Sequence, residues 1–550
     1  MDKIPIKQFF QKTNFVLAII FSLVCVVLVF AGMEEQQLKV FFSSDALYLQ
    51  SIYKDIFLDK TGVGGWNINA APNFFPDMLL YFILNGVFQD FKTATFLFSI
   101  IQYSLIIYLI YLLYSALSKH DAVFYATISI LFLDAFLLVR LISGDFIYTS
   151  YILLSAYHLG SFVMALACLV LTIYYIKTSK GMFLIWLIIL GSLATLSDRL
   201  FIVQYTFPVL FVLLLLFRSL SGMRTLKILS SVLLLTFIGL GIFKIVDNSH
   251  AIRVMDTAWK MFNFSNIGGS FAIFFQQHIG YLKAMDMRGI INVLSIISLI
   301  IITGLFFKGA RALVVKSNTW QNNHLIPMVF IFFAFANTWI TLLTPLINGS
   351  YIAISLLRYN IYALYMLMML YGFYLFYSKR VLSNKKVLLG THAGVFLLIV
   401  VLGVKLIWST DIKDGLKNYF NYYPETTQCL DNAMKEENIQ YGVAHYWEAK
   451  FNTMFSKNNL RMYAVYPNYD AYYHATNKNW FYKTGRGKFG DPEFNFVFVS
   501  SEKINEVEDK FGEVKKIIPC PDDYVICIVN PFRFNRTNRR LIKYEGPDFQ

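Results

Sequence analysis

A single carboxylate near the start of the chain is the residue best suited to acid–base chemistry. Asp45 lies in a polar and aromatic stretch, residues 33–85, that separates two apolar parts of the chain. An acid held at a membrane boundary on a structured loop is a functional candidate, because ionisable groups are costly there. Such a carboxylate can accept a proton from a hydroxyl or an amine, or orient that group for reaction.

The position of Asp45 also predicts a structural role. Ser43, Ser44 and Asp45 have the residue types of a helix N-cap and stand ahead of an amphipathic helix. The apolar face of that helix would comprise Leu47, Tyr48, Ile52 and Ile56. Because a capping aspartate is also well positioned, the two roles are compatible and both stay open.

The elements that position this loop are predicted to cross a membrane. Of the 550 residues, 57% are hydrophobic and 15% are charged, which is not the composition of an ordinary soluble chain. Apolar runs of about 20 residues recur, as transmembrane helices require. We predict eleven spans: 14–32, 94–117, 122–139, 158–176, 182–197, 200–218, 226–245, 289–307, 325–344, 355–377 and 387–408.

Two apolar segments need a separate interpretation. The first span follows a basic N-terminus like a signal peptide, but the many later spans favour a retained signal anchor. The segment 74–89 is short and has Pro76 and Asp77 near its start. We therefore predict a short helix there that lies in the outer leaflet or dips into it.

The basic residues give the orientation in the membrane. The linkers 177–180, 218–227, 308–316 and 379–386 are basic and contain no acid, which places them and the N-terminus in the cytoplasm. The loops 33–90 and 246–288 and the residues after 409 would then face the other side. Residues 409–550 carry 19 basic and 19 acidic residues, so the net charge of +14 comes from the membrane part and indicates no nucleic-acid partner.

The chain is predicted to divide into a membrane domain, residues 1–408, and an extracytoplasmic α/β domain, residues 409–550. Strand-like segments alternate with helical ones in the second part. Cys429 and Cys520 are predicted to form a disulfide on the oxidising side, because Cys527 belongs to an apolar strand. Three free thiols are the alternative.

This layout resembles the GT-C superfamily of membrane glycosyltransferases that use polyprenyl-phosphate sugars. The likeness is nearest to the protein O-mannosyltransferase and lipid A aminoarabinose transferase group, whose first external loop carries an acid before an aromatic helix. Here the acid stands in Asp45-Ala46 rather than Asp-Glu, and residues 71–76 match a Pro-containing element loosely. Residues 357–360, Leu-Arg-Tyr-Asn, resemble an Arg-Tyr pair before a late helix. Segments at 441–450, 472–474 and 479–481 resemble tails of uncharacterised bacterial GT-C-like proteins.

The resemblance implies an α-helical polytopic protein of the cytoplasmic membrane, with about eleven transmembrane helices, a short outer-leaflet helix and a C-terminal extracytoplasmic α/β domain. The implied reaction is the inverting transfer of a sugar from a polyprenyl phosphate to an acceptor glycan, lipid or protein beside the bilayer. Asp45 would be the base, and Arg358 and Arg199 would stabilise the phosphate charge. No cofactor is needed, and a divalent ion bound by Asp45 stays an open alternative.

The substrate-binding candidates lie near the outer ends of predicted spans or in the external loops. Arg358 would clamp the lipid phosphate or only anchor a helix end. Adjacent Asp198 and Arg199 cannot share a helix face, so each should have its own partner; they cap and anchor a helix, or Asp198 holds Arg199 toward a phosphate. The remaining candidates are Tyr359, Arg140, His158 and Trp66.

Three other functions stay open on the sequence. A transporter or flippase of lipid-linked saccharides needs ionisable residues deep in the spans, and Asp134 is the only acid well inside an apolar run. A saccharide polymerase or ligase would share the architecture and the donor. A non-catalytic glycan-binding membrane protein would use the tail alone.

Overall fold

The structure is a computed structural model of the whole chain. It describes residues 6–118, 121–143, 151–248, 252–254, 263–283, 287–315, 322–353, 358–381, 411–482, 492–535 and 539–543. The predicted boundary at residue 408 and the last predicted span, 387–408, lie outside the described residues.

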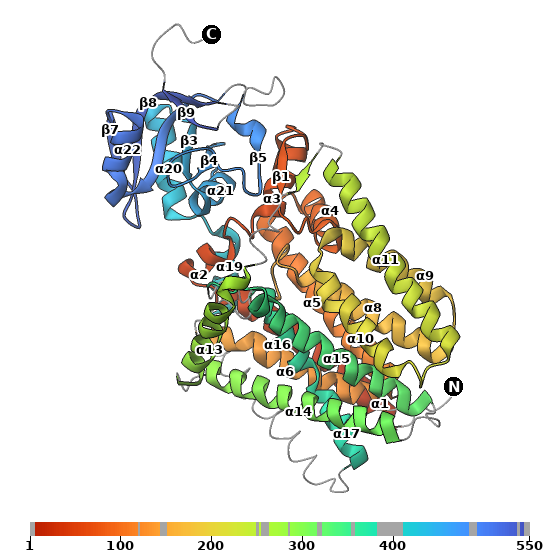
Figure 1. The fold of residues 1–550 in the computed structure, drawn as a ribbon. Helices are drawn as coiled ribbons and strands as arrows, with labels where there is room; N and C mark the ends of the chain where they lie inside the picture. The colour runs from red at the N-terminus through yellow and green to blue at the C-terminus, as the bar shows by residue number, and fades with distance from the viewer. Residues whose placement is uncertain are drawn as a thin grey trace.

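Most of the described chain forms a bundle of α-helices beside a smaller α/β region, which lies at the upper left of Figure 1. The main helices of the bundle are α1 (Ile6–Ala31), α5 (Phe91–Leu117), α6 (Ala122–Ser143), α8 (Leu159–Thr178), α9 (Met182–Ser197), α10 (Phe207–Leu216), α11 (Gly222–Asn248), α13 (Ile267–Lys283), α14 (Met287–Val315), α15 (Asn322–Ile347), α16 (Ile361–Met369) and α17 (Tyr371–Val381). Shorter helical pieces are α2 (Glu35–Phe41), α3 (Tyr48–Tyr53), η1 (Lys54–Leu58), η2 (Phe74–Met78), α4 (Leu79–Phe88), η3 (Ile202–Thr206) and η4 (Phe264–Asn266).

Five described helices are long and apolar enough to cross a membrane: Phe91–Leu117, Leu159–Thr178, Gly222–Asn248, Arg288–Leu313 and His324–Ile347. Phe15–Ala31 joins them if it and Glu35–Phe41, which meet at a 109° bend, count as one span. Four other predicted spans correspond to shorter apolar helices. The short helix predicted for residues 74–89 is also present, as η2 and α4.

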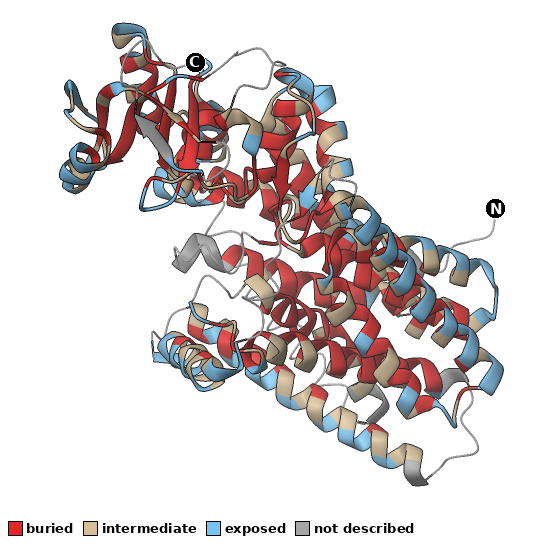
Figure 2. Ribbon diagram, turned by 45° about the horizontal axis from the view of Figure 1, so that its top comes forward, coloured by how far each residue is buried: buried red, intermediate tan, exposed pale blue. Residues whose placement is uncertain are grey.

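The outer faces of the bundle are apolar as well as its core. Helices α11 and α14 carry rows of exposed large hydrophobic side chains, including Phe237, Ile245, Ile300 and Phe307, and both helices show extensive exposed surface in Figure 2. Large exposed apolar surfaces mark contact with a membrane or with another protein. Because α11 and α14 are also long and apolar enough to cross a membrane, their exposed apolar side chains agree with helices whose outer sides face lipid.

The acid buried within the bundle has a structural explanation. Asp134 on α6 is fully buried and accepts hydrogen bonds from Ser22 on α1 (2.8 Å) and Tyr103 on α5 (2.7 Å). Buried polar groups need such partners. Asp134 therefore ties three helices together, which removes the main observation in favour of an ion-coupled transporter.

The α/β region is built on one mixed sheet, as the alternation of strands and helices predicts. Its strand order is β4 (Arg461–Val465), β3 (Tyr441–His445), β6 (Phe494–Ser500), β8 (Tyr524–Phe534), β7 (Lys516–Pro519), and β9 (Leu541–Lys543) also pairs with β8. Strand β3 is parallel to β4 and β6, whereas β8 is antiparallel to its neighbours. The accompanying helices are α19 (Ile412–Asn421), α20 (Glu425–Glu437), α21 (Tyr446–Phe455), α22 (Ile504–Phe511) and the 3-10 turns η6 (Lys478–Phe481) and η7 (Ser501–Lys503).

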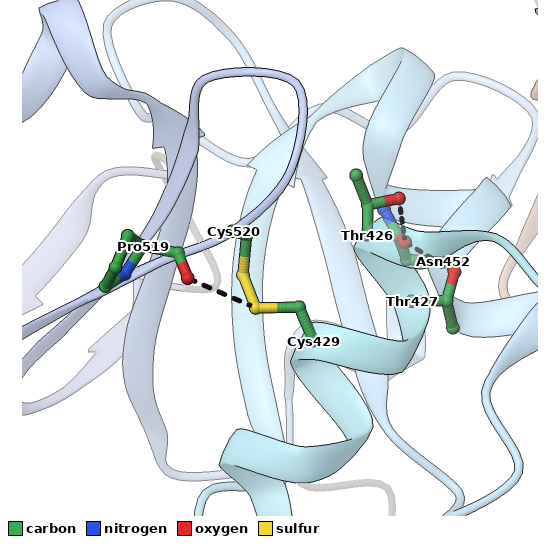
Figure 3. Close-up of a disulfide and its surroundings, with 6 residues drawn as sticks. All are labelled: Thr426, Thr427, Cys429, Asn452, Pro519 and Cys520. Atoms are coloured by element: carbon green, nitrogen blue, oxygen red, sulfur yellow. Dashed lines mark hydrogen bonds between the residues drawn. A yellow bond between two sulfur atoms is a disulfide. The ribbon is translucent and has the colours of Figure 1, made fainter.

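A disulfide fastens helix α20 to the end of strand β7. Cys429 and Cys520 are bonded, with Cα atoms 5.8 Å apart (Figure 3), and Cys527 is a buried free thiol on β8. The predicted pairing is confirmed. A cross-link that closes a loop this long restricts the unfolded chain of the α/β region.

Backbone packing and strand pairing both help to fix the α/β region on the bundle. Helix α19 lies against the end of α1 so closely that a Cβ at Gly415 would stand 2.0 Å from the carbonyl oxygen of Ala31. A small sheet makes the second contact: β1 (Trp66–Ile68) pairs in parallel with β2 (Arg253–Val254) and in antiparallel with β5 (Thr476–Asn477). These strands come from the first loop, the 246–288 region and the tail, so the small sheet joins three distant parts of the chain.

Candidate active site

Asp45 lies in the turn between α2 and α3, where the bundle meets the α/β region. Its carboxylate accepts hydrogen bonds from the Arg358 guanidinium (2.9 Å) and the Tyr446 hydroxyl (2.6 Å). The Nε2 atom of His474 lies 4.0 Å from it. One side of the carboxylate thus faces the bundle, through Arg358, and the other faces the tail.

The predicted helix cap at Asp45 is wrong. Helix α3 begins at Tyr48 and has Leu47 as its N-cap residue, with no side-chain cap hydrogen bond. The Asp45 carboxylate is instead occupied by the charge-assisted hydrogen bond from Arg358 and the hydrogen bond from the Tyr446 hydroxyl. Ser44 is also engaged elsewhere, since its hydroxyl donates to the carbonyl oxygens of Tyr446 (2.6 Å) and Trp447 (3.0 Å).

The surroundings keep Asp45 ionised. Burial opposes ionisation, but Arg358, the Tyr446 hydroxyl, His474 and Lys450 together outweigh it and lower the pKa of Asp45 below its ordinary value of 3.8. A carboxylate in this state is a permanent hydrogen-bond acceptor at neutral pH. It can hold the hydroxyl or amine of an acceptor and take up its proton as that group reacts.

Arg358 retains hydrogen-bonding capacity for a ligand. Its Nη1 atom is used by Asp45, whereas its buried Nε atom has no hydrogen-bond partner among the described residues. The guanidinium lies 5.3 Å from the centre of the Tyr359 ring, just before α16 enters the bundle. Arginine can bind a phosphate and a carboxylate with different edges of one planar group.

A second polar group continues from Tyr359. The His158 ring lies 5.3 Å from the Tyr359 ring, and His158 Nδ1 pairs with Asp198 Oδ2 at 2.7 Å. Asp45, Arg358, Tyr359, His158 and Asp198 therefore form a series of contacts around the ends of α8, α9 and α16. The structure brings together five of the predicted site residues.

The remaining predicted site residues lie elsewhere or are not described. Arg199 donates to the carbonyl oxygen of Ala70 (3.2 Å). Asp198 is hydrogen-bonded to His158 instead. The hypothesis that Asp198 holds Arg199 toward a phosphate is therefore wrong. Trp66 is buried and donates to Asp55 at 2.9 Å. The side chain of Arg140 lies outside the described residues, as do His250, Asp256, Trp259 and Lys260 of the 246–288 loop.

Comparisons with known proteins give a fold but no curated relative. No protein-family model and no curated protein matches the sequence. Among solved structures, the crystal structure of ArnT from Cupriavidus metallidurans bound to undecaprenyl phosphate matches 92% of this chain and 97% of its own, with a TM-score of 0.52 and 12% identity. The chain has the GT-C fold.

Within this GT-C fold, the tail supplies residues that the sequence did not assign to the site. Tyr446, Lys450 and His474 all lie near Asp45, from α21 and from the loop before β5. Tyr446 and His474 stand in the segments that resemble GT-C-like tails, and that resemblance was the available signal. The His474 ring is stacked on Tyr472, with ring centres 5.5 Å apart, which orients it toward Asp45.

A buried polar network attaches the first loop to the tail beside the site. Asp55 is fully buried and accepts hydrogen bonds from Trp66 (2.9 Å), Asn477 (2.9 Å) and Trp480 (2.8 Å). A second buried acid, Asp59, pairs with Lys54 at 2.9 Å and with Arg461 of β4. Because removing one member of such a network leaves a buried charge unpaired, the network holds the tail firmly in register with Asp45.

Across the described residues, no three His, Cys, Asp or Glu side chains are grouped so that they could hold a metal ion. The charges that surround Asp45 are those of Arg358, His474 and Lys450.

Proposed function

We infer that this protein is an inverting glycosyltransferase that moves a sugar from a polyprenyl-phosphate donor to an extracytoplasmic acceptor. The observation that carries the proposal is the contact between Asp45 and Arg358 at the boundary between the bundle and the tail. The fold likeness supports it, since ArnT was solved with undecaprenyl phosphate bound. Residues 1–408 would be the membrane domain, and the tail would stand on the extracytoplasmic side.

In the proposed mechanism, Asp45 is the base and Arg358 stabilises the leaving phosphate. The acceptor hydroxyl or amine gives its proton to Asp45 as its heteroatom forms a bond to the anomeric carbon. The bond from that carbon to the phosphate oxygen breaks, and its electron pair leaves with the polyprenyl phosphate. Arg358 stabilises the charge that develops on this leaving group through its remaining N–H donors. Attack from the face opposite the phosphate inverts the anomeric configuration.

The location of Arg358 suits a lipid-linked phosphate. It stands directly before α16 (Ile361–Met369), whose residues are buried in the bundle. The phosphate of a polyprenyl carrier must remain near the headgroup level while its chain lies in the hydrocarbon. A cation at a helix entrance meets that requirement.

The experiment that tests the proposal is sugar transfer by the purified full chain. A panel of radiolabelled polyprenyl-phosphate sugars is incubated with cell-envelope extract as acceptor source, with and without a chelator. We expect transfer from at least one donor, unchanged by the chelator, into a product of inverted anomeric configuration. Retention of configuration, or sugar uptake into sealed vesicles without transfer, would contradict it.

A further inference from the structure

The tail turns tightly after strand β4 and leaves a tyrosine exposed at the edge of the large sheet. Tyr466, the first residue of the turn, is 40% exposed, whereas all five residues of β4 are buried. Pro467 and Asn468 of the same turn are exposed as well. A single exposed aromatic ring is ordinary on a protein surface, so the neighbours of Tyr466 decide whether it has a role.

Tyr466 lines an open groove of about 450 Å³. The other residues along the groove are Pro467, Asn468, Asp470, Ala471 and Arg539. Aromatic rings beside a few well-placed polar groups are the usual lining of a ligand site of this size. A sugar has the matching surface, because its ring carries C–H groups on its faces and hydroxyl groups around its rim.

The described residues that line the groove are balanced in charge. Asp470 brings one negative charge and Arg539 brings one positive charge, and the others are uncharged. A sugar hydroxyl can donate to the carboxylate and accept from the guanidinium. A lining without excess charge suits a neutral saccharide better than a phosphate or carboxylate group.

The turn holds these groups in place before any ligand binds. The Tyr466 N–H donates to the carbonyl oxygen of Asp470 (2.9 Å), and the Tyr469 N–H donates to that of Tyr466 (2.8 Å). The side-chain amide of Asn468 donates to the Asp470 carboxylate (2.9 Å). Tyr469 is buried, with its ring 5.1 Å from that of Phe511, and anchors the turn on the tail. A groove that is formed in advance loses less entropy when it binds a ligand.

A row of rings joins the groove to Asp45. The centre of the Tyr472 ring lies 4.4 Å from that of Tyr466 and 5.5 Å from that of His474. The His474 Nε2 atom is in turn 4.0 Å from the Asp45 carboxylate. Exposure rises along the row, from 16% for the Asp45 side chain and 25% for that of His474 to 40% for Tyr466. Three contacts therefore separate the carboxylate from the ring in the groove, a reach that a short oligosaccharide can span.

We propose that the groove beside Tyr466 is a distal subsite for a neutral glycan acceptor, whose reacting end lies at Asp45. The proposal rests on the proposed glycosyltransferase function and narrows the acceptor from a glycan, lipid or protein to a neutral saccharide chain. The Tyr466 ring stacks on the C–H face of one sugar, and the polar side chains of the groove hydrogen-bond to its hydroxyl groups.

Binding is measured on the full chain in nanodiscs of zwitterionic lipid, without donor. The probes are oligosaccharides released from the cell envelope by mild acid and separated by anion exchange into a neutral and an acidic pool, and peptides of envelope proteins. We expect the neutral pool to bind equally well at low and high salt, because the groove has no net charge to be screened. Binding of the acidic pool alone, of the peptides alone, or of none of the three would overturn the proposal.

Two variants and a control separate a sugar-binding ring from a merely exposed one. Tyr466→Ala should weaken binding of the neutral pool at least about tenfold, as expected when an aromatic anchor is truncated, whereas Tyr466→Phe keeps the ring and should bind like wild type. Ile517→Ala is the control, because Ile517 is 43% exposed on β7, at the other end of the strand order. Equal binding by Tyr466→Ala and wild type would overturn the proposal.

Arg539→Gln is a second test that does not depend on the fold of the turn in Tyr466→Ala. The Arg539 side chain is exposed, so the melting temperature should stay close to that of wild type. Loss of its charged donors should weaken binding of the neutral pool at least about fivefold, and unchanged binding would overturn the proposal. These readouts need no turnover. Groove binding without sugar transfer from any donor would contradict the glycosyltransferase function alone, whereas transfer without groove binding would contradict the subsite alone.

Discussion

At the scale of single residues, the site is defined by what surrounds one carboxylate. Asp45 and Arg358 are 313 positions apart in the chain, yet their side chains meet at 2.9 Å. Sequence alone singled out both, because an acid in an external loop and an arginine at a helix entrance are each unusual in an apolar chain. It could not predict Tyr446 as a partner, since an aromatic residue in a tail is usually part of a core.

The Tyr446 hydroxyl gives the first prediction. Tyr446→Phe keeps the ring between Asp45 and Lys450 and removes only the hydrogen bond to the carboxylate. This hydrogen bond fixes the position of the carboxylate, and misplacing a reacting group by about 1 Å can cost about a hundredfold in rate, so we expect kcat for sugar transfer to fall about tenfold to a hundredfold. Steady-state kinetics at saturating donor measure this. An unchanged kcat would mean that Tyr446 does not act on the base.

The pKa of Asp45 determines how kcat/KM for sugar transfer should depend on pH. Its folded pKa is lowered below 3.8, so the carboxylate stays ionised, and its contribution is lost only as the pH falls through that lower value. We expect no acidic limb from Asp45 in kcat/KM between about pH 5 and 8. The control is Tyr446→Phe. Loss of the hydrogen bond raises the pKa of Asp45 in this variant, so the acidic limb of the pH profile should shift to higher pH. If kcat/KM of the wild type shows an acidic limb near neutral pH, and this limb shifts in Tyr446→Phe, the assignment of Asp45 as a permanently ionised base is contradicted.

At the scale of elements, the site depends on short strands that no sequence pattern reveals. Strands β1, β2 and β5 have only two or three residues each, and pairing between parts of the chain so far apart has no local signal. The longer elements were predictable: the strands of the tail and most helices of the bundle stand where their apolar patterns place them. The helix cap at Asp45 was mispredicted because Arg358, a distant residue, competes for the same carboxylate.

The contact between the first loop and the tail gives the element-scale prediction. Arg461→Met removes the tail partner of Asp59, which keeps only Lys54 of its own loop, so we expect the docking of the tail to be destabilised by about 1.5–3 kcal/mol. Hydrogen exchange should then increase at residues 66–68 and 476–477 while β3 and β6 stay protected. Arg533→Met is the matched control, because Arg533 pairs with Glu493 on an exposed surface and surface pairs contribute little. Equal exchange in both variants would show that the buried network does not hold the tail.

At the scale of the whole molecule, the bundle and the tail each supply one side of the site. The bundle brings Arg358, just before α16, to one side of Asp45, and the tail brings Tyr446, His474 and Lys450 to the other side. The sequence predicted the two parts and the apolar spans, because composition and periodicity report on burial in a membrane. It could not predict how the parts meet, since that arrangement follows from the packing of α19 on α1 and from the small sheet.

The central claim is that Asp45 is the base for sugar transfer, and Asp45→Asn tests it most directly. Asparagine keeps the size of the side chain and can still accept one hydrogen bond, but it cannot take up a proton. The measurement is the single-turnover rate of sugar transfer from a competent polyprenyl-phosphate donor, with melting temperature and donor binding as controls for folding. We expect both controls to match wild type and the rate to fall by at least about a hundredfold. A variant that folds, binds donor and transfers sugar at the wild-type rate would contradict the claim.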